Sequence, residues 1–260
     1  MINYIKYEHN TSNEWITFVH GAGGSSTIWY KQIKSFSKKY NVLLIDLRGH
    51  GRSYKLGFDN LHKKYTFPII ANDILEVLDY ENIKTSHFVG ISLGTIIIRQ
   101  IAEDYPERVQ SMILAGAILK FNLTSQFLMK LGWVFKSIVP YMLLYKFFAF
   151  IIMPKDNHKQ SRNLFVREAK NVYKKEFIRW YKMTADINPI LKLFRNVELP
   201  IPTLYLMGEE DAMFLPAIQQ VLKTHVNYSH LEVISNCGHV VNVDKPEIFN
   251  KTVFSFIKSL

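Results

Sequence analysis

Short apolar runs alternate with longer amphipathic segments along most of the chain. Runs rich in β-branched, leucine and aromatic residues predict buried strands at 15–19, 42–45, 87–90, 112–115, 203–207 and 231–234. Apolar residues at helical spacing predict helices at 27–39, 67–80, 93–105, 215–225 and 246–257. Continuous apolar strands that alternate with helices are typical of a mostly parallel sheet with helices on both faces.

This alternation stops in one long segment. The strand pattern is lost after Leu119 and resumes after the proline-rich stretch 199–202. Between Phe165 and Tyr181, apolar residues recur every three or four positions with Lys and Arg between them, which predicts an amphipathic helix with a basic face. We therefore expect a core formed by residues 1–119 and 198–260, and a helical insert at 120–197.

The positive charge belongs to this insert. Of the 260 residues, 48% are hydrophobic and 14% aromatic, which excludes a disordered or collagen-like chain. The net charge is +10, yet residues 120–195 hold 15 Lys and Arg against four acids, and the remainder holds 17 against 18. Since the charge is confined to the insert, we expect no nucleic-acid partner. Two interpretations stay open, a solvated cationic face or a weak contact with anionic membrane surfaces.

Three features of the sequence bear on the cellular location: the cysteine content, the first residues and the most apolar stretch. Cys237 is the single cysteine, which excludes an intrachain disulfide and suits a reducing compartment. The first eight residues lack the apolar core of a signal peptide. The most apolar stretch, 131–153, is interrupted by Lys136, Pro140 and Lys146, whereas a membrane span needs about 20 apolar residues. These features predict a soluble, cytoplasmic protein.

Ser92 is the candidate nucleophile. It is the serine of a G-x-S-x-G pentapeptide, 90–94, between a predicted strand and a predicted helix. A serine on such a tight turn projects its hydroxyl from the carboxyl end of the sheet, and the glycines relieve crowding around its strained backbone. The competing interpretation is an ordinary glycine-bounded turn.

A serine hydroxyl needs a base, and the base needs an acid that orients it. His239 follows the last predicted strand in a glycine-containing loop, and the other histidines lie in less suitable contexts. Asp211 follows the strand 203–207, with Glu209 and Glu210 as rival acids. The order serine, aspartate, histidine is the one expected of an α/β-hydrolase.

The glycine-rich loop 20–25 is the candidate oxyanion-stabilising element. Backbone N–H groups fixed in a dry pocket can stabilise the oxyanion that forms when serine attacks a carbonyl. We expect the amides of Ala22 and Leu93 to be these donors. A phosphate-binding role is disfavoured because neither nucleotide-binding glycine pattern is present. No His, Cys and acid cluster has metal-ligand spacing, so we expect neither metal nor cofactor.

Together these motifs resemble the α/β-hydrolase superfamily, in its capped, single-domain branch. The similar segments are the H-G-x-x-G-S-like loop 20–25 with Trp29, the D-x-R-G-x-G-x-S turn 46–53, the nucleophile motif 90–94, the acid segment 205–211 and Gly238–His239. The likeness covers 15–119 and 200–258. It implies an α/β-hydrolase fold, a mostly parallel sheet flanked by helices, with a helical cap inserted after the sixth strand. In such enzymes the insert shapes the acyl or alcohol pocket.

The expected activity is cofactor-free hydrolysis of carboxylic esters of small to medium apolar substrates through an acyl-enzyme. Ser92 speaks against the epoxide hydrolases and haloalkane dehalogenases of this superfamily, which use an aspartate nucleophile. Two alternatives remain: hydrolysis of a C–C bond or a lactone by the same triad, and a ligand sensor whose cap recruits a partner. In the insert, Phe165, Phe177 and Trp180, with Val172 and Tyr173, are expected to line an apolar pocket. The sequence does not indicate the natural substrate or the oligomeric state.

Overall fold

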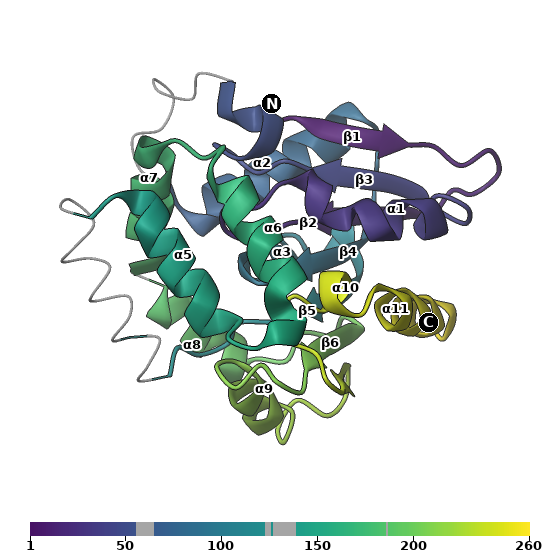
Figure 1. Cartoon of the computed structure of the whole chain (residues 1–260). Coiled ribbons are helices and arrows are strands. Elements are labelled where there is room, and N and C mark those ends of the chain that lie inside the picture. The colour runs from purple at the N-terminus through teal and green to yellow at the C-terminus, as the bar shows by residue number, and fades with distance from the viewer. Residues whose placement is uncertain (56–64, 123–125, 127–138, 186) are drawn as a thin grey trace.

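The protein is built around one twisted sheet (Figure 1). The computed structural model describes all residues except 56–64, 123–125, 127–138 and 186. The strands are β1 (Tyr4–Tyr7), β2 (Trp15–Val19), β3 (Asn41–Ile45), β4 (Ser86–Ile91), β5 (Val109–Ala115), β6 (Thr203–Gly208) and β7 (Ser229–Ile234). Their order is β1-β3-β2-β4-β5-β6-β7, with β1 antiparallel to β3 and every other pair parallel.

Helices cover both faces of this sheet. The described α-helices are α1 (Tyr30–Phe36), α2 (Phe67–Tyr80), α3 (Leu93–Asp104), α5 (Tyr141–Ile152), α6 (Lys159–Ala169), α7 (Lys174–Ala185), α8 (Asn188–Asn196), α9 (Leu215–Val221), α10 (Val241–Asp244) and α11 (Pro246–Lys258). Short 3₁₀ turns lie at Ser26–Trp29, Gly51–Lys55, Pro106–Arg108 and Asp156–His158. One apolar cluster joins the sheet to α2, α3, α8 and α9, and a second joins it to α1, α10 and α11.

The strands are apolar on both sides because each side is buried. In β5, Met112 and Leu114 belong to the cluster with α2 and α3, whereas Ile113 and Ala115 belong to the cluster with α11. Successive side chains of a strand point to opposite faces, so a continuous apolar run is what a doubly covered sheet requires. The prediction of a mostly parallel sheet with helices on both faces is confirmed.

Several features differ from expectation. Strand β1 was not predicted, because this edge strand is only half-buried and pairs antiparallel, so its residues lack a continuous apolar run. The helix predicted at 27–39 is a 3₁₀ turn followed by α1, which ends at Phe36. The inserted helices follow the fifth strand, β5, rather than the sixth, since β1 is the single described strand ahead of β2.

Helices α5 to α8 lie between β5 and β6, and Figure 1 places α5, α6 and α7 together at the carboxyl ends of the parallel strands. The helix predicted across 165–181 is two helices. N–H groups of Lys170, Asn171 and Val172 bond to carbonyls three residues back, which tightens and ends α6 before α7 begins. The predicted insert, 120–197, contains residues 123–125, 127–138 and 186, which lie outside the described part. Among the described helices, none is long and apolar enough to span a membrane.

Candidate active site

Ser92 occupies a strained turn between β4 and α3. Its φ of 54° and ψ of −121° are unfavourable for a residue with a side chain. The two glycines of the motif lie in close packing, which is tightest at Gly94. A Cβ on Gly90 would lie 2.6 Å from Ile98 Cδ1, and one on Gly94 would collide with the Val19 and His20 carbonyl oxygens. The turn therefore holds Ser92 at the carboxyl edge of the sheet.

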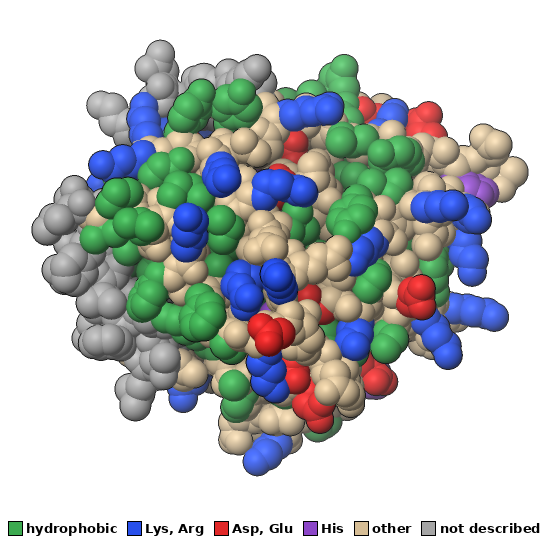
Figure 2. Space-filling view, in the orientation of Figure 1, with side chains coloured by type: hydrophobic (Ala, Val, Ile, Leu, Met, Phe, Trp, Pro, Cys, Tyr) green, Lys and Arg blue, Asp and Glu red, His purple; other side chains and the backbone are tan. Residues whose placement is uncertain are grey.

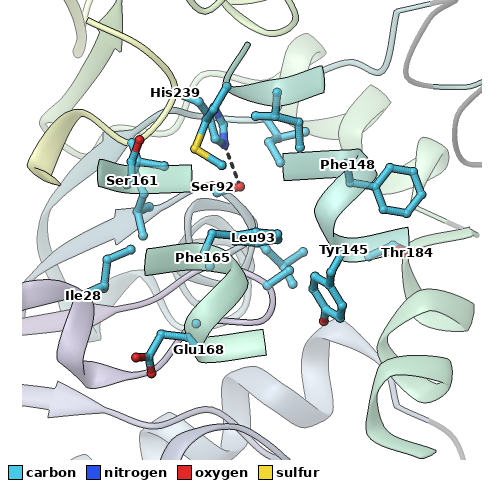
Figure 3. A pocket seen from close by; sticks show the side chains of 18 of the residues that line it. Ile28, Ser92, Leu93, Tyr145, Phe148, Ser161, Phe165, Glu168, Thr184 and His239 are labelled. Atoms are coloured by element: carbon cyan, nitrogen blue, oxygen red, sulfur yellow. Dashed lines mark hydrogen bonds between the residues drawn. The ribbon is translucent and has the colours of Figure 1, made fainter. Parts of the chain in front are cut away.

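His239 connects Ser92 to Asp211. Its Nε2 lies 2.9 Å from Ser92 Oγ, and its Nδ1 lies 2.7 Å from Asp211 Oδ2 (Figure 3 shows the first of these bonds). Asp211 and His239 are 1% and 3% exposed. Because a carboxylate only accepts, the proton sits on Nδ1 and the Ser92 hydroxyl donates to Nε2. The three residues predicted from three separate segments thus form one hydrogen-bonded line.

The rival acids point elsewhere. Glu209 accepts a hydrogen bond from the Asn236 N–H at 3.2 Å. Glu210 accepts from Lys155 and His158, each at 2.7 Å, and Lys155 is the foremost cause that lowers the pKa of Glu210 to about 2. Asp211, rather than either glutamate, bonds to His239.

The glycine loop approaches Ser92 closely. A Cβ on Gly21 would lie 3.1 Å from Ser92 Cβ and 3.7 Å from its Oγ. Ala22 and Leu93 both line the cavity above Ser92. Leu93 is the first residue of α3, where backbone N–H groups have no carbonyl partner within the helix. These positions suit the predicted oxyanion donors.

Two buried histidines hold this loop. The Gly23 N–H donates to His50 Nε2 at 3.0 Å, and the Leu47 N–H donates to His20 Nε2 at 3.0 Å. A ring nitrogen accepts only when it is unprotonated, so both imidazoles are neutral. Burial lowers the pKa of His50 to about 3, and burial likewise lowers the pKa of His20. The conformation of the loop therefore depends on two neutral imidazoles.

A cavity of about 240 Å³ opens directly above Ser92 and His239. Phe165, Phe177 and Trp180 line it, as expected. Val172 and Tyr173 do not line it: Val172 is buried in an apolar cluster with Ala169 and Phe177, and Tyr173 is 60% exposed with its ring on Tyr54. Side chains from the core and from the inserted helices meet here, and Figure 3 shows several of them. The lining includes Ile28, Ile91, Leu93, Ile118, Phe121, Tyr145, Phe148, Ile152, Met153, Leu164, Met213, Phe214 and Val240.

The inserted helices are anchored to the core on several sides of this cavity. The Trp180 indole N–H donates to the Arg48 carbonyl at 3.0 Å, in the turn that also carries His50. Ser25 Oγ donates to Glu168 at 2.7 Å. His158, which is fully buried, bonds to Glu210 and packs against Gly238, next to His239. The contacts that hold the inserted helices over the cavity therefore involve core residues close to the candidate triad.

Sequence reasoning did not assign His50, Tyr145 or His158 to this site. His50 lies in the turn 46–53, to which no role in the site was assigned, and the other two lie in the insert, for which no local pattern specifies a partner in the core. Cys237 is fully buried, and burial raises the pKa of its thiol to about 12, as suits a small core residue. Among the residues that the structure describes, no group of three His, Cys, Asp or Glu is placed to hold a metal ion.

The fold and this geometry are those of an α/β hydrolase, and the comparison with protein families agrees. The family model described as "alpha/beta hydrolase fold" matches residues 14–148, more than half of the chain. The chain therefore belongs to this family, and at the level of class it is a hydrolase.

Individual relatives are distant. The chain is 26% identical to human epoxide hydrolase 4, covering 88% of this chain and 68% of the relative. It is also 26% identical to the pimeloyl-[acyl-carrier protein] methyl ester esterase of Wigglesworthia glossinidia brevipalpis, covering 94% and 93%. Among solved structures, Est816, an N-acyl homoserine lactone degrading enzyme, superposes with a TM-score of 0.77 at 25% identity, covering 98% and 96%. The names of these three enzymes specify different bonds.

Proposed function

We propose that this protein is a serine hydrolase that cleaves carboxylic esters of small to medium apolar substrates. One observation carries the proposal: Ser92 Oγ, His239 Nε2, His239 Nδ1 and Asp211 Oδ2 form a continuous hydrogen-bonded line beneath an apolar cavity. The similarity to a methyl ester esterase supports the same bond type.

The reaction proceeds in two halves. Ser92 Oγ attacks the ester carbonyl while its proton passes to His239 Nε2, and Asp211 stabilises the imidazolium. The amides of Ala22 and Leu93 donate to the oxyanion. The alcohol leaves with the proton from His239, and the acyl group stays on Ser92. His239 then deprotonates a water molecule that attacks the acyl-enzyme, which releases the acid and restores Ser92.

The cavity limits the substrate. A volume of about 240 Å³ is just below the usual range of small-molecule pockets, about 300–1,000 Å³. Its polar side chains are few, among them Ser92, His239, Ser161, Thr184 and Glu168. Short to medium acyl chains or apolar alcohols fit such a space. An epoxide substrate is disfavoured, since the nucleophile position holds a serine.

The test is a fluorophosphonate probe together with esters of graded acyl length. Wild type should be labelled and should turn over many equivalents of ester, whereas a ligand sensor would stop after about one. Ser92→Ala should lose both labelling and turnover. The matched control is Ser161→Ala, because Ser161 lines the same cavity but donates to the His158 carbonyl, and it should remain labelled. Labelling of Ser92→Ala would refute the assignment.

A lactone is the second candidate, favoured by the similarity to Est816. Ring opening uses the same attack, with the alcohol tethered to the acyl group. Parallel assays with N-acyl homoserine lactones and with linear esters of the same acyl chain separate the two. A kcat/KM at least tenfold higher on the linear ester would support the proposal, and the reverse ratio would assign the lactone.

A further inference from the structure

Apart from Lys146, helix α5 carries only aliphatic and aromatic side chains on all its sides. Its inner face carries Tyr145, Phe148 and Ile152, which line the cavity. Its outer face carries Leu143, Phe147 and Phe150, which are 53%, 44% and 59% exposed. A helix that is hydrophobic all round normally has both sides covered. The outer face has the spacing of a single helical row, at positions i, i+4 and i+7.

Cations lie within this row and beside it on α6. Lys146 is exposed within it, one turn from Leu143 and Phe150. Helix α6 packs beside α5, and the Arg162 guanidinium lies over the Phe150 ring, 5.6 Å from its centre. Lys159 and Lys170 are exposed at the two ends of α6. In sequence, residues 139–197 hold 12 Lys and Arg against four acids.

Figure 2 shows both kinds of side chain on one face: hydrophobic groups over α5 lie directly beside Lys and Arg over α6. We define the lipid-facing surface as Leu143, Lys146, Phe147, Phe150 and Lys159. Two of the described acids of this region are engaged elsewhere, since Glu168 accepts from Ser25 and Glu176 pairs with Arg179. The surface therefore combines exposed aromatic groups with excess positive charge.

We propose that the lipid-facing surface docks this protein on anionic lipid bilayers. Phe and Leu side chains from one helix suit shallow insertion between headgroups, while Lys and Arg beside them neutralise lipid phosphates. The long stems of lysine can lie along the apolar row with the ammonium at the headgroups. Docking brings the inner face of α5, and with it the cavity, next to the acyl region of the bilayer.

The first test is co-sedimentation of the full chain with vesicles. Binding is expected to phosphatidylcholine vesicles that contain phosphatidylglycerol, at about 50 mM salt, and to fall several-fold at about 500 mM salt, where charges are screened within a few ångströms. Phe147→Ser combined with Phe150→Ser, and Lys146→Glu alone, should each lower the binding constant about tenfold. The matched controls are Ile248→Ser, at a residue 48% exposed on α11, and Lys251→Glu on the same helix. Both controls should bind as wild type.

A second test locates the contact. Phe147→Cys can be labelled with an environment-sensitive fluorophore, because the native Cys237 is fully buried. Its emission should shift to the blue on anionic vesicles, while the same label on Ile248→Cys should not shift. Equal binding by the lipid-facing and control variants, or equal shifts at both labels, would overturn the proposal.

Two further outcomes would also overturn it. The first is that the chain neither binds vesicles nor self-associates. The second is that it does not bind vesicles but self-associates, and that Phe147→Ser abolishes the self-association. That result would make the face a contact between copies of the chain. The inference does not depend on ester chemistry. Ser92→Ala should bind vesicles as wild type does, so failure of the proposed activity and failure of docking give different results.

Discussion

Gly116 lies directly against the ring of His239. A Cβ at this position would come within 3.2 Å of both Nδ1 and Cε1 and would collide with the His239 carbonyl oxygen. Gly116 directly follows β5 and has a φ of +50°, so both the close contact and the backbone conformation disfavour a side chain here. The absence of a side chain at Gly116 therefore leaves room for the imidazole of His239, the candidate base.

Gly116→Ala should therefore displace the base. We expect kcat to fall about 100-fold, since a shift of about 1 Å in a catalytic group has that effect. The backbone strain alone costs about 1 kcal/mol in stability. Asn82→Ala is the control, because Asn82 also has a positive φ, 56°, but lies after α2, away from the site. It should lose similar stability and keep its kcat; equal losses of kcat would contradict the steric explanation.

Asp211→Asn should lower kcat by about 10⁴, as the corresponding aspartate-to-asparagine change does in a Ser-His-Asp protease. The amide cannot stabilise the imidazolium and favours the wrong tautomer. Glu209→Gln and Glu210→Gln should cost less than tenfold, because these glutamates bond to Asn236 and to Lys155 rather than to His239. Steady-state ester hydrolysis measures all three, and the opposite ranking would move the acid to a neighbour.

His50 is expected to act as a positioning residue for the oxyanion loop. His50→Leu removes the acceptor of the Gly23 N–H, so the loop relaxes and kcat should fall about 100-fold with little change in KM. His50→Gln supplies an amide oxygen and should recover part of that loss. If the two variants were equally slow, packing rather than hydrogen bonding would be the role of the ring.

Stability should decline in acid because His50 is buried neutral. Its pKa is about 3 in the folded protein and about 6.5 in the unfolded chain, so the unfolded chain binds the extra proton between these values. The stabilisation is complete above pH 6.5 and decreases as the pH falls toward 3, by about 1.4 kcal/mol per pH unit. When the pH falls from 6.5 to 5, the free energy of unfolding measured in urea should decrease by about 2 kcal/mol less in His50→Gln than in wild type. Parallel losses would contradict the assignment.

Adjacent residues of α5 should differ in their effect on substrate choice. Phe148 lines the cavity and Phe147 faces outward. Phe148→Ser should lower kcat/KM about tenfold for octanoyl esters and less than twofold for acetyl esters, since each buried methylene contributes about 0.8 kcal/mol. Phe147→Ser, assayed in vesicle-free buffer, should leave both rates within twofold. Equal losses on the two esters would exclude an acyl-binding role for Phe148.

The sequence predicted those parts of the site that local rules determine. Ser92, Asp211 and His239 each follow a strand in a recognisable loop, and parallel strands bring such loops to one edge. The bond from His50 to Gly23 was not predictable in this way, because it joins two loops through the packing of rings. Nor was the division of 165–181 into α6 and α7, since an apolar period of three to four residues continues across the turn at 170–173. The outward row of α5 was not predicted, because Lys146 is the single charged residue of this helix and one residue does not define a polar side.

Substitutions in α5 and changes in its length should have different consequences for its two faces. Substitutions alter one face at a time, so residues toward the cavity and residues toward solvent can evolve separately. An inserted or deleted codon within the helix has another effect: it rotates every later side chain by about 100°. Phe147 and Phe150 would then turn away from solvent, and Phe148 and Ile152 away from the cavity. We therefore expect homologues to differ in the residues of this helix but to have no insertion or deletion within it, so that the later side chains keep their orientation relative to Tyr145.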